Sequence, residues 1–315
     1  MNKKMLEYLM DNEENHSYEH SINDKTQPLV SVVMPVFNND NFVSNSINSI
    51  LKQSYRNFEF IIVDDGSTDS SAEIIREFND ERIQFIHHDE NRGNYGCRNE
   101  GINLSKGKYV CVMDSDDEAL PIRIETQVAF LEKNKDILAI GSQFELIGSD
   151  ISFYQPQNYD LIKVLLISNN MFLHPSLLIR KGILDQIEGY NEIYYYSSDY
   201  DLVCRLSTIG KIINLPSVLM KYRVHNSQIS ILKKEKQKEY ANNIRLRYLK
   251  LLGFSLTTSD EFLLNVIINK EIVEISLNKI QSLFNKITKQ NEDLHAFDSA
   301  YLRMLFYTYE KASLH

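Results

Sequence analysis

The sequence predicts an α/β fold in which a doubly wound, mostly parallel sheet is flanked by helices, followed by an α-helical C-terminal region. Two observations lead to this prediction. Short apolar runs alternate with segments of helical periodicity in the first half of the 315-residue chain, and strand patterns stop after about residue 232. Alternation of this kind with short loops is typical of βα units that build a parallel sheet.

Four apolar runs in the first half are expected to form strands that are buried on both faces. They are Leu29–Val36, Phe58–Val63, Ile83–His87 and Lys108–Met113. Between them, apolar residues recur at helical spacing, as Val43, Ile47 and Ile50 do after the first strand. A further helix is predicted over Arg98–Leu104.

The second half has a more mixed pattern. We predict strands over Phe172–Arg180 and Lys211–Arg223, and a helix over Ser198–Ile209. After residue 232, helical periodicity continues over Lys233–Leu252, Ser259–Lys286 and Glu292–Ala312. The chain is therefore divided into an N-terminal extension (1–28), a central domain (29–231) with halves at 29–117 and 118–231, and a helical region (232–315).

Composition limits the classes of function. The net charge of −9 argues against a protein that binds nucleic acid by neutralising phosphates. No apolar run approaches the roughly 20 residues that cross a bilayer, and the polar N-terminus lacks the apolar stretch of a secretory signal. The three cysteines lie far apart without metal-ligand spacing. We therefore expect a cytoplasmic protein with reduced thiols.

An acidic cluster, Asp114-Ser115-Asp116-Asp117, follows the fourth predicted strand. Carboxylates this close repel one another, and each loses hydration when it is buried. A hard divalent cation that also holds a phosphate would relieve the repulsion. The alternative is a solvated acidic turn that caps the next helix.

Two other strands also end in candidate binding segments, Pro35–Asn38 and Asp64–Asp69. In doubly wound sheets, ligands bind outside the carboxyl ends of the strands. We therefore expect these two segments and the acidic cluster to line one crevice.

The succession of these motifs resembles the inverting family 2 glycosyltransferases, which have the GT-A fold. The resemblance extends from about residue 29 to 225, and its order and spacing are more specific than any single motif. It is carried by residues 30–38 (VSVVMPVFN), 63–69 (VDDGSTD), 91–93 (NRG), 98–101 (RNEG), 107–110 (GKYV) and 114–117 (DSDD).

The resemblance implies a nucleotide-sugar donor, usually a UDP-sugar, bound by the 29–117 half. Phe37, beside Pro35 and Val36, would flank the base, with an ordinary core aromatic as the alternative. Asp65 would accept the uracil N–H, which suits a carboxylate, while one of Asp64 and Asp65 serves only the turn. Arg98 would offset the diphosphate charge, or else be a surface residue.

The resemblance also implies a Mn²⁺ or Mg²⁺ cofactor. Asp116 would be a metal ligand, and Asp114, with Ser115 beside it, would contact the ribose or a metal-bound water. His225 would complete the metal shell or contact the diphosphate, and imidazole suits Mn²⁺ better than Mg²⁺; a hydrogen-bonded loop histidine is the alternative. Asp117 is expected to cap the following helix.

Inversion requires a base that takes the proton from the acceptor hydroxyl. The resemblance assigns this role to Asp199, although Ser198 replaces the glutamate that commonly precedes it in the family. A helix N-terminus would stabilise the ionised carboxylate, and an N-cap is the structural alternative. The 118–231 half would bind the acceptor, with His174 and Glu192 expected on the acceptor or donor-sugar side.

The segment 233–252 carries a local charge of +5 over residues 233–250 together with apolar residues. It is expected either to contact a membrane surface peripherally or to pack on the core with a solvated basic face. The other C-terminal helices would cover the acceptor cleft or form a homodimer contact.

These inferences predict transfer of a hexose or N-acetylhexosamine to a hydroxyl of a glycan or lipid-linked saccharide. Polysaccharide or lipooligosaccharide assembly at the inner face of a bacterial cytoplasmic membrane is the expected setting. Two alternatives are a catalytically silent binding or scaffold protein, and a sugar-phosphate nucleotidyltransferase. The second would need a Gly-rich, basic loop after the first strand, where residues 35–40 have neither glycine nor a basic residue.

Overall fold

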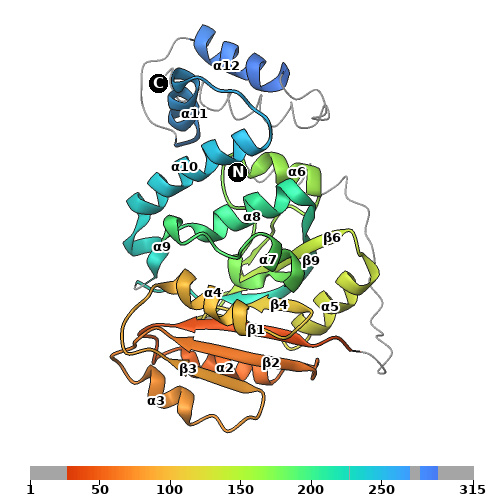
Figure 1. Cartoon of the computed structure of the whole chain (residues 1–315), viewed down its shortest axis with the longest axis vertical. Coiled ribbons are helices and arrows are strands. Elements are labelled where there is room, and N and C mark those ends of the chain that lie inside the picture. The colour runs from red at the N-terminus through yellow and green to blue at the C-terminus, as the bar shows by residue number, and fades with distance from the viewer. Residues whose placement is uncertain (1–26, 227, 270–276, 290–315) are drawn as a thin grey trace.

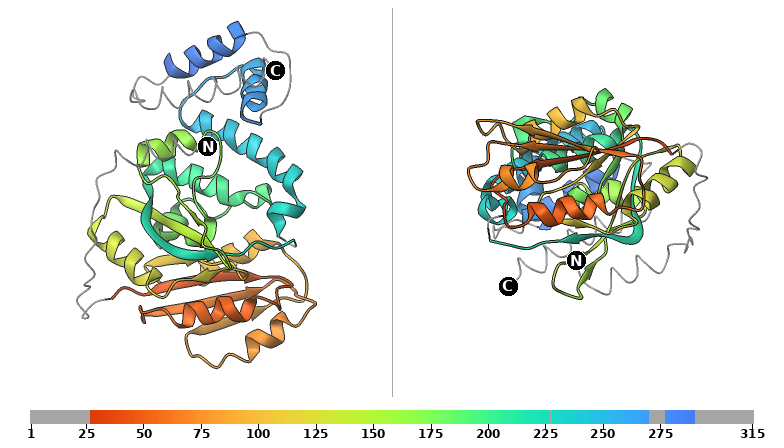
Figure 2. Two further views of the ribbon diagram at one scale, coloured as in Figure 1. Left: turned by 180° about the vertical axis from the view of Figure 1, so that it is seen from behind. Right: turned by 90° about the horizontal axis from the view of Figure 1, so that it is seen from below.

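A computed structural model of the chain describes residues 27–226, 228–269 and 277–289. Within these residues, one nine-stranded sheet has the order β3-β2-β1-β4-β8-β6-β9-β5, and β7 pairs with β6. Helices cover both faces of the sheet (Figures 1 and 2). The predicted α/β fold class, with a helical C-terminal region, is confirmed.

The first four strands form the parallel half of the sheet. They are β1 (Val30–Val36), β2 (Phe58–Asp64), β3 (Ile83–His87) and β4 (Tyr109–Val112). β2 and β4 lie on opposite sides of β1, and all three pairings are parallel. The strand order therefore reverses between β1 and β4, which is the point where doubly wound sheets bind ligands. The acidic cluster follows β4 directly.

Side chains of β1 alternate between two cores, as the period of two in a strand requires. Val32 and Met34 pack in the core on the α2 (Val43–Leu51) face. Val33 packs on the other face with Ile102 of α4 (Asn94–Leu104). The other helix of this half is α3 (Ser71–Arg76), and α5 (Arg123–Lys133) begins the second half. The helix predicted from Arg98 thus begins four residues earlier, at Asn94.

The second half adds mostly antiparallel pairings. Its strands are β5 (Glu118–Ala119), β6 (Ile137–Leu146), β7 (Ser152–Phe153), β8 (Leu178–Arg180) and β9 (Lys211–Tyr222). β8 runs antiparallel to both β4 and β6, whereas β6 and β9 are parallel. Strand β6 is not among the strands that the sequence predicts, because buried Ser142 and Gln143 interrupt its apolar run.

The strand predicted over Phe172–Arg180 is wrong in its first part. His174–Ser176 forms a short 3₁₀ helix, η1, and only Leu178–Arg180 is extended as a strand. Pro175 has no N–H to donate to a sheet ladder, which explains the interruption. The predictions of β9 and of helix α8 (Ser198–Ile209) are confirmed. The other helices of this half are α6 (Tyr159–Leu165), α7 (Lys181–Gln186) and the 3₁₀ helix η2 (Glu192–Tyr194).

The C-terminal region is helical where it is described. It contains α9 (Ile229–Leu232), α10 (Lys234–Leu251), α11 (Thr258–Asn269) and α12 (Leu277–Lys289). Helices α11 and α12 lie at the end of the long axis opposite to β2 and β3 (Figure 1). The predicted N-terminal extension up to residue 26, residues 270–276 and the helix predicted over 292–312 lie outside the described residues. The domain boundaries stay predictions.

Helix α10 packs on the core rather than presenting its apolar side to the surroundings. Ile244, Tyr248 and Leu249 are buried in the same cluster as residues of α8, whereas Leu251 is half exposed. Within the described residues, no helix is long and apolar enough to cross a membrane. Peripheral membrane contact through 233–252 stays a prediction, and it would depend mainly on the basic side chains of this segment.

Gly107 provides a direct test of how tightly the loop before β4 packs on β1. A Cβ atom at this position would lie 2.6 Å from the backbone nitrogen of Ser31. We expect Gly107→Ala to lower the free energy of unfolding by about 1–3 kcal/mol, the usual cost of overpacking. Gly182→Ala is the matched control, because a Cβ there meets nothing within 4 Å. Urea denaturation measures both, and equal stabilities would contradict the packing described.

Candidate active site

Three carboxylates crowd the loop after β4. One oxygen from each of Asp114, Asp116 and Asp117 lies within 4.8 Å of the others. Burial raises the pKa of Asp114, and the negative charge of Asp116 raises it further, although Arg98 lowers it. The pKa of Asp117 is raised well above its ordinary value, first by burial and then by Asp116 and Asp114. Burial and the mutual repulsion of these carboxylates therefore both disfavour their ionised forms.

Arg98 of α4 is the cation that reaches the cluster from the parallel half. Its guanidinium forms an ion pair with the Asp114 carboxylate and donates to the Met113 carbonyl over 3.2 Å. Only 1% of Arg98 is exposed, so the surface-residue alternative is wrong. Its contact with a nucleotide stays a prediction, and its observed role is to fix Asp114.

The segment after β9 brings Arg223 and His225 to the cluster. Arg223 donates its backbone N–H to Asp117 Oδ1 over 2.9 Å and its Nε–H to the Asp116 carbonyl over 2.8 Å. His225 Nε2 lies 2.9 Å from Asp116 Oδ2. Asp116 and His225, both predicted as metal ligands, thus lie together although they are distant in sequence.

Asp117 does not cap the following helix, so this prediction is wrong. The N-cap residue of α5 is Ile122, and no side chain caps that helix. Asp117 is fully buried instead, and its Oδ2 has no hydrogen-bond partner among the described residues. A buried polar atom without a partner costs about 1–3 kcal/mol. Three carboxylates, one with an unsatisfied oxygen, and one imidazole form a donor set that fits a divalent cation such as Mn²⁺ or Mg²⁺.

The cluster is fixed by the hydroxyl group of Ser46 on α2 and by an amide side chain in the loop before that helix. Ser46 Oγ–H is placed to donate to the carbonyl of Ser115 at 2.8 Å or of Asp117 at 2.6 Å. Asn39 Nδ2 donates to Ser115 Oγ over 2.7 Å. Ser115 is therefore held from both sides, with 9% of its surface exposed.

The end of β1 presents an exposed aromatic ring beside the cluster. Phe37 is 48% exposed, so the core-aromatic alternative is wrong. Val36, the residue before it, is buried, and its carbonyl accepts the N–H of Asp65 over 2.8 Å. Pro35 and Val36 thus place Phe37 next to the β2 turn.

Both carboxylates of that turn are engaged in the fold. Asp64 Oδ2 lies 2.6 Å from His87 Nδ1. Asp65 Oδ1 accepts the N–H of Arg92 over 2.6 Å, and Oδ2 accepts that of Gly93 over 2.9 Å. An ionised carboxylate has about four acceptor sites, so Asp65 retains acceptor capacity. Its contact with uracil stays a prediction.

Asp199 lies in the first turn of α8 and faces the parallel half. Its Oδ1 accepts from Tyr95 Oη–H over 3.0 Å, and its Oδ2 accepts from Asn170 Nδ2 over 2.9 Å. The N-cap position belongs to Ser197, so the cap alternative is wrong. Burial raises the pKa of Asp199, although the hydrogen bonds from Tyr95, Tyr200 and Asn170 lower it. Backbone N–H groups at the start of α8 therefore favour the ionised form, as expected, but burial outweighs them.

Aromatic rings connect Asp199 with the acidic cluster. Tyr95 and Tyr190 stack with centroids 5.3 Å apart, and the charges of Arg98, Asp114 and Asp199 all act on Tyr190. The Asp199 charge also raises the pKa of Asp114. The predicted base and the predicted donor site therefore share one region.

His174 and Glu192 join this region through different partners. His174 Nε2 lies 2.7 Å from Tyr190 Oη, and burial keeps its pKa well below the ordinary value, so the ring is neutral. Glu192 Oε1 accepts from Asn99 Nδ2 over 2.9 Å. Their roles toward a sugar or acceptor stay predictions.

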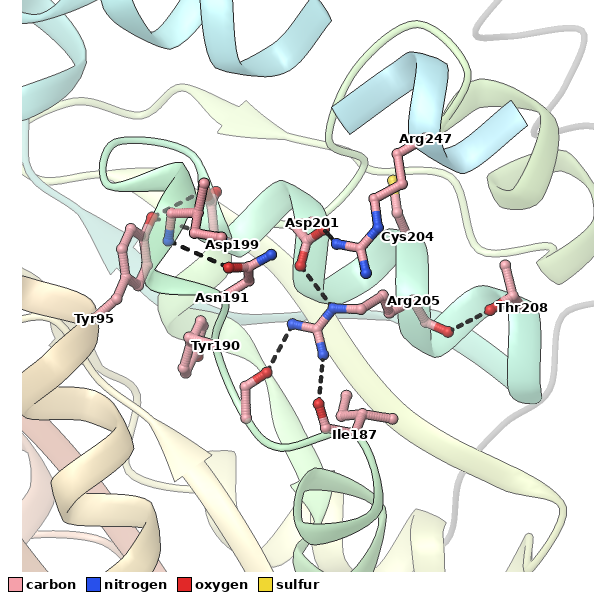
Figure 3. A network of polar contacts seen from close by, with 12 residues as sticks. Tyr95, Ile187, Tyr190, Asn191, Asp199, Asp201, Cys204, Arg205, Thr208 and Arg247 are labelled. Carbon is pink, nitrogen blue, oxygen red and sulfur yellow. Dashed lines mark hydrogen bonds and ion pairs between the residues drawn. The ribbon is translucent and has the colours of Figure 1, made fainter. Parts of the chain in front are cut away.

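The sequence does not reveal Tyr95 and Asn170, because only the fold brings them to Asp199. It also does not single out Asp201, which accepts from Arg205 Nε over 2.6 Å and from Arg247 over 2.8 Å (Figure 3). Arg205 also donates hydrogen bonds to the carbonyls of residues 187 and 189, just before Tyr190. The four-residue spacing of Asp201 and Arg205 on a helix is a signal that could have indicated this pair.

Loss of the hydrogen bond from Tyr95 should produce a measurable shift in the pKa of Asp199. Because this bond favours the ionised carboxylate, Tyr95→Phe should raise the pKa of Asp199, so its ionisation moves to higher pH. Carbon-13 NMR of labelled aspartate carboxyl groups follows the titration, and Asp199→Asn identifies the resonance. Tyr194→Phe is the control, because its ring contacts Tyr240. An unchanged or lower pKa in Tyr95→Phe would contradict this geometry.

The chain is similar to known proteins over most of its length. Residues 31–198 match the family described as "Glycosyl transferase family 2". An uncharacterized glycosyltransferase of Methanocaldococcus jannaschii is 34% identical over 70% of this chain and 79% of its own length. One of Haemophilus influenzae is 34% identical over 73% and 77%.

Solved structures show the same fold. The crystal structure of S. aureus TarS 1-349 in complex with UDP-GlcNAc has a TM-score of 0.62 at 18% identity, covering 90% of both chains. The mannosyltransferase PcManGT from Pyrobaculum calidifontis, in complex with GDP-Man and Mn²⁺, has a TM-score of 0.56 at 14% identity, covering 99% of this chain and 92% of its own. The nucleotidyltransferase alternative is therefore wrong: the chain belongs to glycosyltransferase family 2 and is a glycosyltransferase with the GT-A fold.

Proposed function

We propose that this protein is a metal-dependent, inverting glycosyltransferase that moves a hexose or N-acetylhexosamine from a UDP-sugar to a hydroxyl of a glycan or lipid-linked saccharide. The observation that carries the proposal is the placement of Asp199. This partly buried carboxylate lies close enough to the acidic cluster for its charge to act on Asp114, and Tyr95 and Asn170 hold it by hydrogen bonds.

The donor nucleotide is placed at the reversal of strand order between β1 and β4. Phe37 offers an exposed ring for the base, with the backbone of Pro35 and Val36 beside it. Asp65 accepts the uracil N–H, and Asp114 and Ser115 contact the ribose. Arg98 holds Asp114 in place and lends positive charge to the diphosphate side. The fold relative TarS, crystallised with UDP-GlcNAc, makes a UDP-sugar the first donor to test.

Asp116 and His225 would hold the cation, with Asp114 and Asp117 beside them. When bound, a divalent cation neutralises the charge that develops on the diphosphate leaving group. Arg223 holds Asp116 and Asp117 through backbone contacts, so the chain itself orients this donor set.

Asp199 acts as the general base. It takes the proton of the acceptor hydroxyl as that oxygen attacks the anomeric carbon, and the UDP leaves from the opposite face with the bonding electron pair. A carboxylate whose pKa is raised by burial is a stronger base than an exposed one. Tyr95 and Asn170 each donate one hydrogen bond to it, which fixes its orientation toward the acceptor.

The acceptor side includes neutral His174 and Glu192, placed beside Tyr190 and on η2. We place the reaction in bacterial surface-glycan assembly, with a polysaccharide or lipooligosaccharide precursor at the cytoplasmic face of the membrane.

A donor panel tests the proposed function directly. UDP- and GDP-sugars are incubated with the protein and Mn²⁺, and nucleotide release is measured. We expect release from at least one UDP-sugar, its loss on chelation, and its loss in Asp116→Ala. Asp136→Ala, an exposed aspartate paired with Lys211, is the matched control. Absence of metal-dependent release would favour the silent scaffold, and preference for a GDP-sugar would contradict the UDP assignment.

The role of Asp199 has its own test. Asp199→Asn keeps the size of the side chain but removes the base, so we expect turnover to fall by roughly 10²-fold or more. UDP affinity, measured by calorimetry, should change far less than turnover, because Asp199 acts on the proposed nucleotide site only through its charge on Asp114. Near-normal turnover of the variant would contradict the assignment.

A further inference from the structure

A cavity of about 350 Å³ lies beside Asp199, away from the acidic cluster. Its wall combines the loop before η1, the start of α8, and helices α10 and α11. The lining residues are Ser168, Asn169, Asn170, Tyr196, Ser197, Asp199, Tyr200, Gln237, Lys238, Ala241, Arg245, Ile268 and Asn269. Its volume falls in the range of about 300–1,000 Å³ that is typical of small-molecule sites.

The chemistry of the wall is unlike that of the donor site. Four of its lining residues carry amides, namely Asn169, Asn170, Gln237 and Asn269, and two, Lys238 and Arg245, are cationic. Among the described lining residues, Asp199 is the only carboxylate. Amides and hydroxyls both donate and accept, so they match the hydroxyl groups of a sugar ring. Tyr196 adds an aromatic ring, whose face suits the apolar side of a pyranose. The wall has no acidic cluster that would repel a sugar carrying an anionic substituent.

The floor of the cavity is held in place by hydrogen bonds from a buried arginine. Arg245 of α10 is 2% exposed and donates to the carbonyls of Ile167 and Ser168 over 2.9 and 3.0 Å. The same loop continues to Asn170, which donates to the Asp199 carboxylate. Helix α10 therefore fixes both the cavity floor and one partner of Asp199.

The roof lies outside the part of the chain that matches the family. The match ends at residue 198, whereas Gln237, Ala241 and Asn269 come from α10 and α11. Asp199 directly follows the matched segment, and the C-terminal helices supply the surface that faces it across the cavity. Selectivity for an acceptor would accordingly reside in the C-terminal helices.

We propose that this cavity binds the terminal pyranoside of the acceptor and presents one of its hydroxyls to Asp199. The proposal rests on the proposed function, because it gives Asp199 the acceptor that a base requires. It assigns to α10 and α11 the role of an acceptor-selecting wall, with Asn169, Gln237 and Asn269 binding the sugar hydroxyls.

Ligand-observed saturation-transfer NMR on the full chain tests the proposal without any donor. The probes are the methyl glycosides of glucose, galactose, mannose, N-acetylglucosamine and N-acetylgalactosamine. We expect at least one to bind the wild type. Ala241→Trp, which fills the cavity, should weaken that binding by about tenfold or more, equivalent to about 1.4 kcal/mol. Asn169→Ala, at an exposed lining position, should weaken it as well.

Asn243→Trp is the matched control, because Asn243 is exposed on the same helix but does not line the cavity. It should bind the probe as the wild type does, and thermal unfolding confirms that each variant is folded. The proposal is overturned if no glycoside binds the wild type, or if Ala241→Trp and Asn169→Ala both bind as tightly as the wild type.

A second arm separates this proposal from the proposed function. Release of UDP from the preferred UDP-sugar is measured with and without the bound glycoside. Stimulation in the wild type and in Asn243→Trp, but not in Ala241→Trp, supports the cavity as the acceptor site. Absence of any UDP release in the wild type would overturn the proposed function, while the binding arm still decides whether the cavity takes a sugar.

Discussion

The crowding of Asp114, Asp116 and Asp117 after β4 is the constraint on which the rest of the site depends. Burial removes water from these carboxylates and leaves their mutual repulsion only partly relieved, as the raised pKa values of Asp114 and Asp117 indicate. Burying several carboxylates close together lowers the stability of a fold unless a bound cation or ligand compensates. Its presence at the reversal of strand order, next to Phe37, is what connects the fold to phosphate and metal chemistry.

Two distant segments hold the cluster together. Arg98 comes from α4, while Arg223 and His225 come from the end of β9. The long β9 therefore closes the site by returning the chain to the loop after β4. Contacts from distant segments also hold Asp199. Tyr95 reaches across from the parallel half, and α10 holds the loop that contains Asn170. Both halves of the active site consequently depend on contacts between the two halves of the domain.

The sequence predicts the parallel half well, because strands buried on both faces are apolar throughout and their ends carry the motifs. It also brings Asp116 and His225 together correctly. Prediction from the sequence fails where a polar residue, which is usually exposed, is buried instead. Ser142 and Gln143 are buried polar residues that obscure β6, and Asp117 looks like a helix cap although it is buried in the cluster. Tyr95 and Asn170 carry no local signal, since their role comes from tertiary contact with Asp199 alone.

The central claim is that the cluster binds a divalent cation together with the donor diphosphate. Electron paramagnetic resonance of Mn²⁺ measures this most directly, because the signal of the free ion is lost on binding. The account predicts one Mn²⁺ bound per chain, with an affinity that increases when UDP is added and does not increase with uridine, which lacks the diphosphate. A free-ion signal that stays undiminished by the protein, with or without UDP, would contradict it.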